Sequence, residues 1–212
     1  PRSTLFPYTT LFRSLFGHSS PANRFVDGDS REHDERSRVL PAGHPALTVS
    51  EKLIQLAGVY RVALLDDVIP FWLRHGLDQE HGGIITSLDR DGAILVTDKS
   101  VWFQGRAAWM FATLHNTIER RPEWLAAARS CLEFSRKHCF APEGKMYFTV
   151  TRDGQPLRMR RYVFSESFAA IANAAYAKAS GDARAAEDAV NIFATYLRYS
   201  FKIGRASCRE RV

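Results

Sequence analysis

Apolar residues recur every three or four positions from Leu53 to Trp72, which predicts an amphipathic helix. Ser50 is the predicted N-cap, and Pro70 is expected to kink the helix or to start a new turn. Similar spacing, with Pro122 in a first turn and Gly181 after a last turn, predicts four more helices. These cover Val101–Arg121, Pro122–Phe140, Ser165–Ala179 and Asp182–Tyr199.

Short apolar runs on either side of a glycine turn predict two β-hairpins. The turns are Asp89–Gly92 and Thr151–Gly154, and the flanking runs are Ile84–Leu88 with Ala93–Val96 and Met146–Val150 with Leu157–Met159. Asp-Gly between apolar runs is typical of a hairpin, because glycine supplies the positive φ that the turn needs.

The hairpins recur in the same place relative to the helices. Their Arg-Asp-Gly turns are 62 residues apart, and each hairpin follows one helix and precedes another. A repeat of this kind cannot bury its apolar face alone, so it indicates stacked neighbours in a superhelix or a closed ring. Five helices are too few to close a ring. The pattern therefore predicts an all-α repeat domain with small β insertions, cut off so that apolar helix faces stay exposed.

The two ends of the chain do not share this pattern. Pro1–Ser14 and Lys202–Val212 back-translate to opposite strands of one common sequencing adapter, so both are expected to be translated adapter. Residues 15–47 have mixed charge, scattered prolines and no sustained period, and are expected to be disordered or a non-native leader. The predicted domain is residues 48–201, which we expect to be the N-terminal half of a longer domain.

The net charge depends on these ends. Six Lys or Arg residues and one Glu in the two adapter-like segments account for +5 of the formal +6. The remaining +1 gives no electrostatic footprint for nucleic acid or for an acidic membrane surface, and no apolar run reaches the ~20 residues of a membrane span. Cys131 and Cys139 within one predicted helix indicate free thiols in a reducing compartment, so a cytoplasmic location is expected.

Few segments carry residues that could perform chemistry. Asp78–Gly83 places two carboxylates and an imidazole beside two glycines, although a helix-end turn explains this composition equally well. No His-x-x-x-His or Cys-x-x-Cys spacing occurs, so no metal is predicted. P-loop and dinucleotide glycine motifs are also missing from the sequence.

Two helix starts are further candidates. Trp102, Gln104 and Arg106 lie near the start of one predicted helix, where an arginine opposes the helix dipole. A specific partner could hold the arginine there, or it could simply be exposed. Phe164–Phe168 has the composition of an N-cap, with its first serine capping and Glu166 at the positive end of the helix.

Four motifs, in this order and spacing, resemble the N-acylglucosamine 2-epimerase family, which is also called renin-binding protein. They are HGLDQEHGG (75–83), KSVWFQGR (99–106), TRDG (151–154) and FSESF (164–168). The resemblance runs from about Tyr60 to Phe201. It implies the N-terminal half of an (α/α)6 barrel of helix pairs, with short hairpins at one end that shape a sugar cleft.

The resemblance also implies an isomerase that interconverts N-acetylglucosamine and N-acetylmannosamine at C2 without a redox cofactor. A base removes the C2 proton, an acid returns one on the other face, and the enolate-like charge must be stabilised. Arg106 matches the family's active-site arginine and is the predicted catalytic residue. Trp102, Gln104, Phe164 and Glu166 match predicted substrate-binding positions near the cleft. The two proton-transfer histidines of the family lie in the second half, so this chain alone is expected to be inactive.

The family further implies an amino-sugar substrate, a full-length homodimer and a nucleotide effector whose site the sequence does not locate. Other functions stay open. The protein could be another sugar epimerase or aldose–ketose isomerase on the same barrel, or a non-catalytic interaction protein of the renin-binding type. A glycoside hydrolase or lyase would need two opposed carboxylates, for which Asp78 and Glu166 are the candidates.

Overall fold

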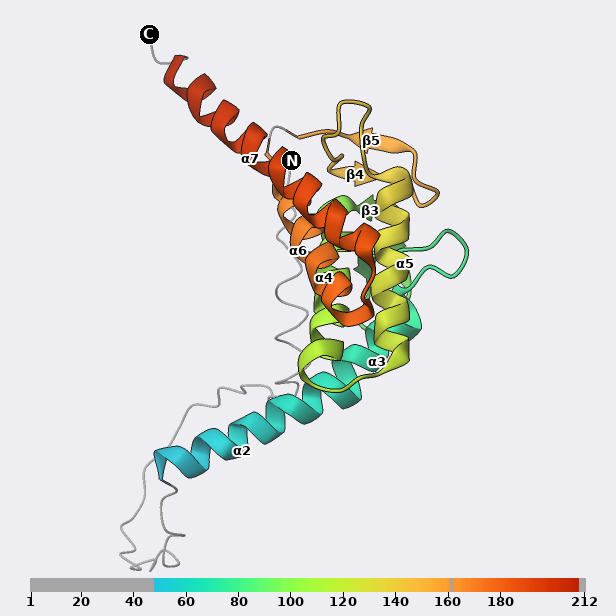
Figure 1. Ribbon diagram of the computed structural model, residues 1–212. Helices are drawn as coiled ribbons and strands as arrows, with labels where there is room; N and C mark the ends of the chain where they lie inside the picture. Colours follow the sequence, from blue (N-terminus) through green and yellow to red (C-terminus); the bar gives the residue numbers. More distant parts are fainter. Residues whose placement is uncertain (1–47, 161, 210–212) are drawn as a thin grey trace, which may run out of the picture. The chain divides into compact units, whose positions relative to one another are not determined.

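The computed structural model describes residues 48–160 and 162–209, mostly as helices with short strands between them (Figure 1). The predictions for residues 1–14 and 15–47, and for the last three residues, lie outside the described residues. The chain divides into two compact units, the first ending at Ile69 and the second starting at Pro70. Each unit is described by itself.

The described part of the first unit begins with helix α2 (Val49–Val62), which a capping box starts. The Thr48 side chain accepts a hydrogen bond from the Glu51 N–H at 3.3 Å, and the Glu51 carboxylate accepts one from the Thr48 N–H at 2.8 Å. The prediction of Ser50 as the cap was wrong. Thr48 has a glutamate three residues later, whereas Ser50 has Leu53 there, and only the first pairing satisfies both N–H groups.

The chain changes its helical hydrogen-bond pattern around Pro70. The π-helical segment η1 (Ala63–Val68) is followed by the short helix α3 (Ile69–Phe71) and by a second π-helical segment, η2 (Trp72–Gly76). Proline has no N–H to donate, so a regular α-helix cannot continue through it without losing a bond. The predicted change at Pro70 therefore takes the form of π-helical turns on both sides.

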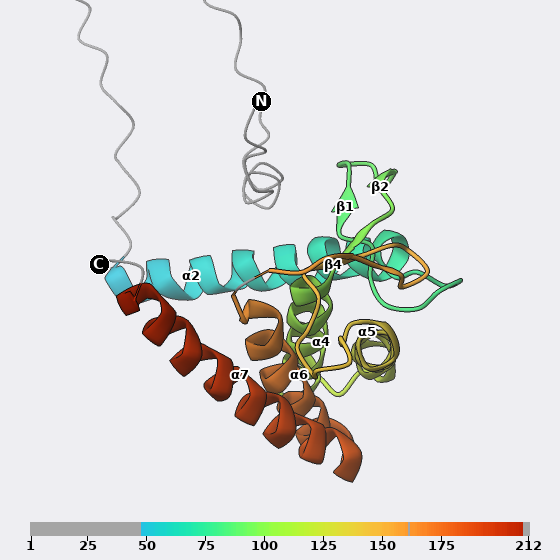
Figure 2. The same ribbon diagram turned by 90° about the horizontal axis from the view of Figure 1, so that it is seen from above.

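Four helices form most of the second unit: α4 (Val101–Thr117), α5 (Pro122–His138), α6 (Phe164–Ser180) and α7 (Ala183–Arg209). Helix α4 packs against α5 and α6, and α6 packs against α7, as Figures 1 and 2 show. All four predicted helices are confirmed. Helix α4 ends four residues earlier than predicted, and α7 continues through Phe201 without a break.

A glycine allows α4 and α6 to approach closely. A Cβ atom at Gly105 would lie 2.8 Å from the Ala169 nitrogen and 2.8 Å from the Phe168 carbonyl carbon, both in the α6 backbone. Such distances are shorter than van der Waals contact, so only glycine fits. The close approach also brings the rings of Trp102 and Phe168 to a centroid distance of 5.6 Å.

Two small antiparallel sheets accompany the helices. Strands β1 (Ser87–Leu88) and β2 (Ile94–Val96) form the first predicted hairpin, and β4 (Thr149–Val150) and β5 (Pro156–Arg158) form the second. Both hairpins are confirmed. A further strand, β3 (Lys99–Ser100), pairs with β4 and joins the two repeats in one three-stranded sheet, which the sequence did not predict.

The predicted repeat is visible in the contacts of its two turns. Gly92 and Gly154 have φ of +91° and +97°, and a Cβ atom on either would overlap the ring of His75 or His138, respectively. Each histidine also contacts a phenylalanine ring one helical turn earlier. The same histidine, glycine and aromatic ring therefore close both hairpins against the preceding helix.

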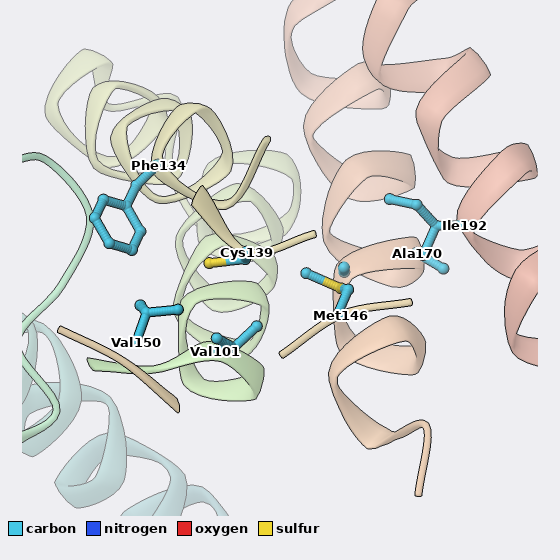
Figure 3. Packing of buried hydrophobic residues seen from close by; sticks show 8 residues of the cluster. Val101, Phe134, Cys139, Met146, Val150, Ala170 and Ile192 are labelled. Carbon is cyan, nitrogen blue, oxygen red and sulfur yellow. The ribbon is translucent and has the colours of Figure 1, made fainter. Parts of the chain in front are cut away.

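A buried hydrophobic cluster lies where the helices meet the second sheet. Its side chains come from α4, α5, β4, α6, α7 and the loop before β4, and most of them are labelled in Figure 3. They are Val101, Phe134, Cys139, Met146, Val150, Ala169, Ala170 and Ile192. Other apolar side chains of α7, such as Val190, Phe193 and Phe201, stay exposed. Among the described helices, none is long and apolar enough to cross a membrane.

Candidate functional site

The predicted site residues lie at the starts of α4 and α6, next to the second sheet. The Val101 N–H donates to the Phe148 carbonyl at 3.0 Å, and the Ser165 hydroxyl donates to the Tyr147 carbonyl at 3.1 Å. Both helix starts are thus hydrogen-bonded to the segment that enters β4. Ser165 is therefore not the N-cap that the sequence predicted, because its side chain points into the unit; Val163 precedes the helix.

Arg106 lies in the second turn of α4 and is half-buried. The effect of the helix dipole falls off within the first turn, so the expected conflict between this arginine and the dipole is small. Its guanidinium carbon lies 5.9 Å from the centroid of the Trp102 ring, a cation–π distance. Trp102 is itself fixed by the rings of Phe103 and Phe168. The indole ring therefore provides one contact for the guanidinium group.

Gln104 is fully buried and holds the backbone of Ile84. Its side-chain oxygen accepts from the Ile84 N–H at 2.8 Å, and its side-chain nitrogen donates to the Ile84 carbonyl at 2.8 Å. Both polar groups of the amide are thereby used within the protein. These contacts make Gln104 a residue that positions the glycine loop 82–84.

Glu166 is also fully buried, in the first turn of α6. One of its oxygens, Oε1, accepts from the Met146 N–H at 2.7 Å, while Oε2 has no hydrogen-bond partner. Burial raises the pKa of Glu166, and the bond from Met146 offsets part of that rise. That Gln104 and Glu166 contact substrate stays a prediction, but the contacts present here are to backbone.

Phe164 differs from these buried residues because 63% of it is exposed. It begins α6, and its ring lies beside that of Tyr162 at a centroid distance of 5.9 Å. Of the five predicted site residues, Arg106, Trp102 and Phe164 thus have surface to offer a ligand.

The structure brings three of the sequence motifs together around one buried carboxylate. Asp78 accepts two hydrogen bonds from the Arg152 guanidinium, each at 2.9 Å, and its Oδ2 lies 2.9 Å from the Lys99 ammonium. The Asp78 and Lys99 side chains are wholly buried. We refer to Asp78, Lys99 and Arg152 as the Asp78 cluster.

Lys99 has further partners that explain how an ammonium group can be buried. It donates to the Gly82 and Arg152 carbonyls at 2.7 and 2.9 Å, and it lies 4.1 Å from the Phe134 ring centroid. Burial lowers the pKa of Lys99, and the hydrogen bond to Asp78 offsets part of that decrease. All three donors of the ammonium group are therefore used, as a buried charge requires.

Asp78 is held ionised by its neighbours. Burial acts to raise its pKa, but hydrogen bonds from Arg152, Lys99 and the His81 N–H outweigh burial and hold the pKa well below its usual range. Its Oδ1 also accepts from the Glu80 N–H, which confirms the predicted helix-end turn. Asp78 and Glu166 both lie buried with internal partners, so neither is presented to solvent as the hydrolase alternative would require.

Sequence reasoning missed Lys99 and the role of Arg152. The two residues are 53 positions apart, and the Asp78–Arg152 pair spans 74. The one available signal was a charged residue, Lys99, two positions before the apolar start of a helix. The pairing of β3 with β4, which makes the contact, has no signature in two-residue strands.

A pocket of about 290 Å³ lies between α5 and residues 81–82, where the glycine loop begins. It is lined by α5 residues that include Ser130, Lys137 and His138, together with His81. Burial lowers the pKa of His138. None of the five predicted site residues lines this pocket, and no group of three or more His, Cys, Asp or Glu within residues 48–160 and 162–209 could hold a metal ion.

Comparison with known sequences gives consistent matches. The family model described as N-acylglucosamine 2-epimerase (GlcNAc 2-epimerase) matches residues 82–211. The N-acylglucosamine 2-epimerase of Mus musculus is 43% identical over 132 residues, which cover 60% of this chain and 32% of that protein. The Homo sapiens protein of the same name is 41% identical, with 60% and 31% covered. A cellobiose 2-epimerase of Ruminococcus albus is 31% identical over 127 residues, with 59% and 32% covered.

Solved structures agree on the fold. The cellobiose 2-epimerase from Spirochaeta thermophila DSM 6192 matches with a TM-score of 0.62 and 29% identity, over 70% of this chain and 37% of that one. A D-mannose isomerase matches with a TM-score of 0.53, over 73% of this chain and 36% of that one; at 18% identity it supports the fold alone. These matches confirm a mostly helical chain that corresponds to part of an (α/α)6 barrel. The chain spans about a third of the length of its relatives.

Proposed function

Because this chain belongs to the N-acylglucosamine 2-epimerase family, we propose that the whole protein is a sugar 2-epimerase acting on N-acetylglucosamine and N-acetylmannosamine. The identity of 41–43% to the mammalian N-acylglucosamine 2-epimerases carries this choice, since identity to the cellobiose 2-epimerases is 24–31%. The chain spans about a third of those relatives. The proposal therefore concerns the whole protein, and the 212 residues alone are proposed to be inactive.

The reaction places a defined demand on the site. Once the sugar ring is open, the C2 proton lies next to a carbonyl group, and its removal leaves negative charge on the carbonyl oxygen. A base on one face and an acid on the other exchange the proton, and fixed donors stabilise the charge. By the family resemblance, the proton-transfer histidines belong to the rest of the protein.

We assign the oxygen-binding role to Arg106. An arginine keeps its charge at any working pH and presents N–H groups in a fixed fork. Contact with Trp102 limits where the guanidinium can point, so less side-chain freedom is lost on binding. Trp102 and the exposed Phe164 would offer apolar surface to the sugar, while Gln104 and Glu166 would act by holding the loops beneath it.

The test is substitution of Arg106 in the complete protein. Arg106→Ala should lower kcat on the order of 10²–10³-fold with a smaller change in KM, because a donor aimed at transition-state charge is removed. Epimer conversion is followed by proton NMR, and C2 exchange by the same method in D₂O. Arg129→Ala is a matched control, since this α5 arginine is 67% exposed and pairs only with Glu133 among the contacts described. Near-normal kcat/KM for Arg106→Ala would reject the assignment.

A cellobiose-type activity is the second candidate, because the structural match to the Spirochaeta thermophila enzyme covers 70% of the chain. Supplying the whole protein with N-acetylglucosamine or cellobiose in parallel separates the two. Conversion of cellobiose without conversion of the amino sugar would overturn the N-acyl assignment and keep the family's chemistry.

A further inference from the structure

The two repeats hold the segment before each hairpin in the same way, except for one functional group. Gln104 and Glu166 are 62 residues apart, and so are their backbone partners Ile84 and Met146. Each side chain projects from the start of a helix, α4 or α6, to a residue in an isolated antiparallel bridge. The two sites are therefore equivalent positions of the repeat.

In both bridges the backbone bonds run between the neighbouring residues. The bonds are Asp78 to Gly83 and Ile85 to Gly76 in the first repeat, and Tyr147 to Cys139 and Ala141 to Lys145 in the second. Ile84 and Met146 are thus members of the non-hydrogen-bonded pairs, so the bridge itself uses neither their N–H nor their C=O. Buried backbone groups of this kind need another partner, such as a side chain or an ordered water molecule.

Gln104 supplies both partners to Ile84, because an amide has one accepting oxygen and one donating nitrogen. Glu166 supplies the accepting oxygen in the same manner, since its Oε1 accepts a hydrogen bond from the Met146 N–H. Its Oε2, which corresponds to the amide nitrogen, is buried without a partner. An ionised carboxylate cannot donate, so the equivalent bond to the Met146 carbonyl is available only to a carboxylic acid.

We propose that Glu166 carries a proton in the folded chain and that its Oε2–H donates to the Met146 carbonyl, so that the acid reproduces the two bonds of Gln104. Glu166 is then a positioning residue that fixes the entry to β4, next to the bond from Ser165 to Tyr147. This inference does not depend on the proposed reaction.

The electrostatic surroundings agree with this assignment. Full burial raises the pKa of Glu166, because the charged form loses its hydration. The Met146 N–H, the backbone N–H of Glu166 itself and the Lys145 ammonium group all act to lower the pKa. Lys145, however, donates its own hydrogen bond to the Arg160 carbonyl. It is the charged group that acts on Glu166 from the adjoining loop.

The test compares Glu166→Gln with the unchanged 212-residue chain by urea unfolding across pH. A carboxyl whose folded pKa lies above its unfolded value of 4.5 contributes stability below that value and loses it as pH rises through the folded pKa. The glutamine variant has no carboxyl at this position and does not lose stability in this way. The difference in urea midpoint, variant minus unchanged chain, should therefore increase as pH rises above about 4.5. A difference that stays constant with pH, or a glutamine variant that fails to fold, would overturn the proposal.

A second measurement reads the proton directly. Infrared spectra of the unchanged chain, at a pH where exposed carboxyls are ionised, should show one neutral carboxylic acid band that Glu166→Gln removes and Glu143→Gln, at an exposed site in the same loop, leaves. Gln104→Glu should add a second such band and a second pH-dependent loss of stability. If the band is missing, or survives in Glu166→Gln, the proton is not on Glu166.

Discussion

Neutralising Asp78 should destabilise the fold more than its small change in size suggests. Asp78→Asn keeps the shape of the side chain but removes the charge that Lys99 and Arg152 share. Lys99 is wholly buried and would be left with no negative partner in the Asp78 cluster. Removing one partner of a buried ion pair costs about 3–5 kcal/mol, because the other charge stays desolvated. Domains of this size are stable by about 5–15 kcal/mol, so the substitution should consume a large part of the total.

The assay is urea unfolding followed by circular dichroism, with a double substitution as the internal check. Asp78→Asn combined with Lys99→Met removes both buried charges, so it should be more stable than Asp78→Asn alone. Arg129→Ala breaks an exposed pair one helical turn apart on α5, which solvent screens, so it should cost far less than Asp78→Asn. The reasoning fails if Asp78→Asn costs no more than Arg129→Ala, or if the double variant is no more stable than the single one.

Acid should produce the same loss without a substitution. The folded pKa of Asp78 lies below its unfolded value of 3.8, so its contribution is present above that value and is lost as pH falls through the folded pKa. The acid-induced loss between pH 3.8 and the folded pKa should be smaller in Asp78→Asn than in the unchanged chain. Equal losses in the two chains would mean that another carboxyl dominates acid unfolding.

Two further predictions concern the helices. Gly105→Ala should lower the stability by about 1–3 kcal/mol, because its Cβ atom would lie 2.8 Å from the α6 backbone. Gly58→Ala in α2, which has open space around it, should be neutral or stabilising in the same unfolding assay, and equal effects of the two substitutions would contradict the close helix contact. Burial raises the pKa of both Cys131 and Cys139 to about 12. In a chain whose third cysteine is removed by Cys208→Ser, neither thiol should therefore react with an alkylating reagent at neutral pH until urea unfolds the chain. Mass spectrometry measures the labelling, and rapid labelling of the folded chain would refute the burial of the two thiols.

The parts of the fold that the sequence predicted correctly are those with a local physical signature. Helix periodicity located α4 to α7, and the glycine of each Arg-Asp-Gly turn located the hairpins, since positive φ is a local requirement. Exact helix starts and changes of helix type were harder to predict. The cap is Thr48 rather than Ser50 because Thr48 has a glutamate three positions later, and the π-helical turns around Pro70 have no periodic signal in the sequence.

The candidate site was predicted less completely, because composition does not say which way a polar side chain points. Gln104 and Glu166 were predicted to bind substrate because they match family positions near the cleft, and the hydrogen bonds described for both run inward to backbone groups. Lys99 was not singled out at all, because its partners come from loops far away in the sequence. The family resemblance supplied Arg106, and residue chemistry alone left its function undecided.

The Asp78 cluster also sets an order in which the chain can become structured during its synthesis. Lys99 is synthesised about 20 residues after Asp78, but Arg152 is synthesised 53 residues after Lys99. At a ribosomal rate of about 5–20 residues per second, roughly 3–10 s therefore pass between the synthesis of Lys99 and that of its last partner. Until then the Lys99 ammonium group lacks one of the three acceptors that it has in the folded chain. The second hairpin thus completes the first repeat, and a nascent chain that stalls before Arg152 would expose an unfinished helix pair to chaperones.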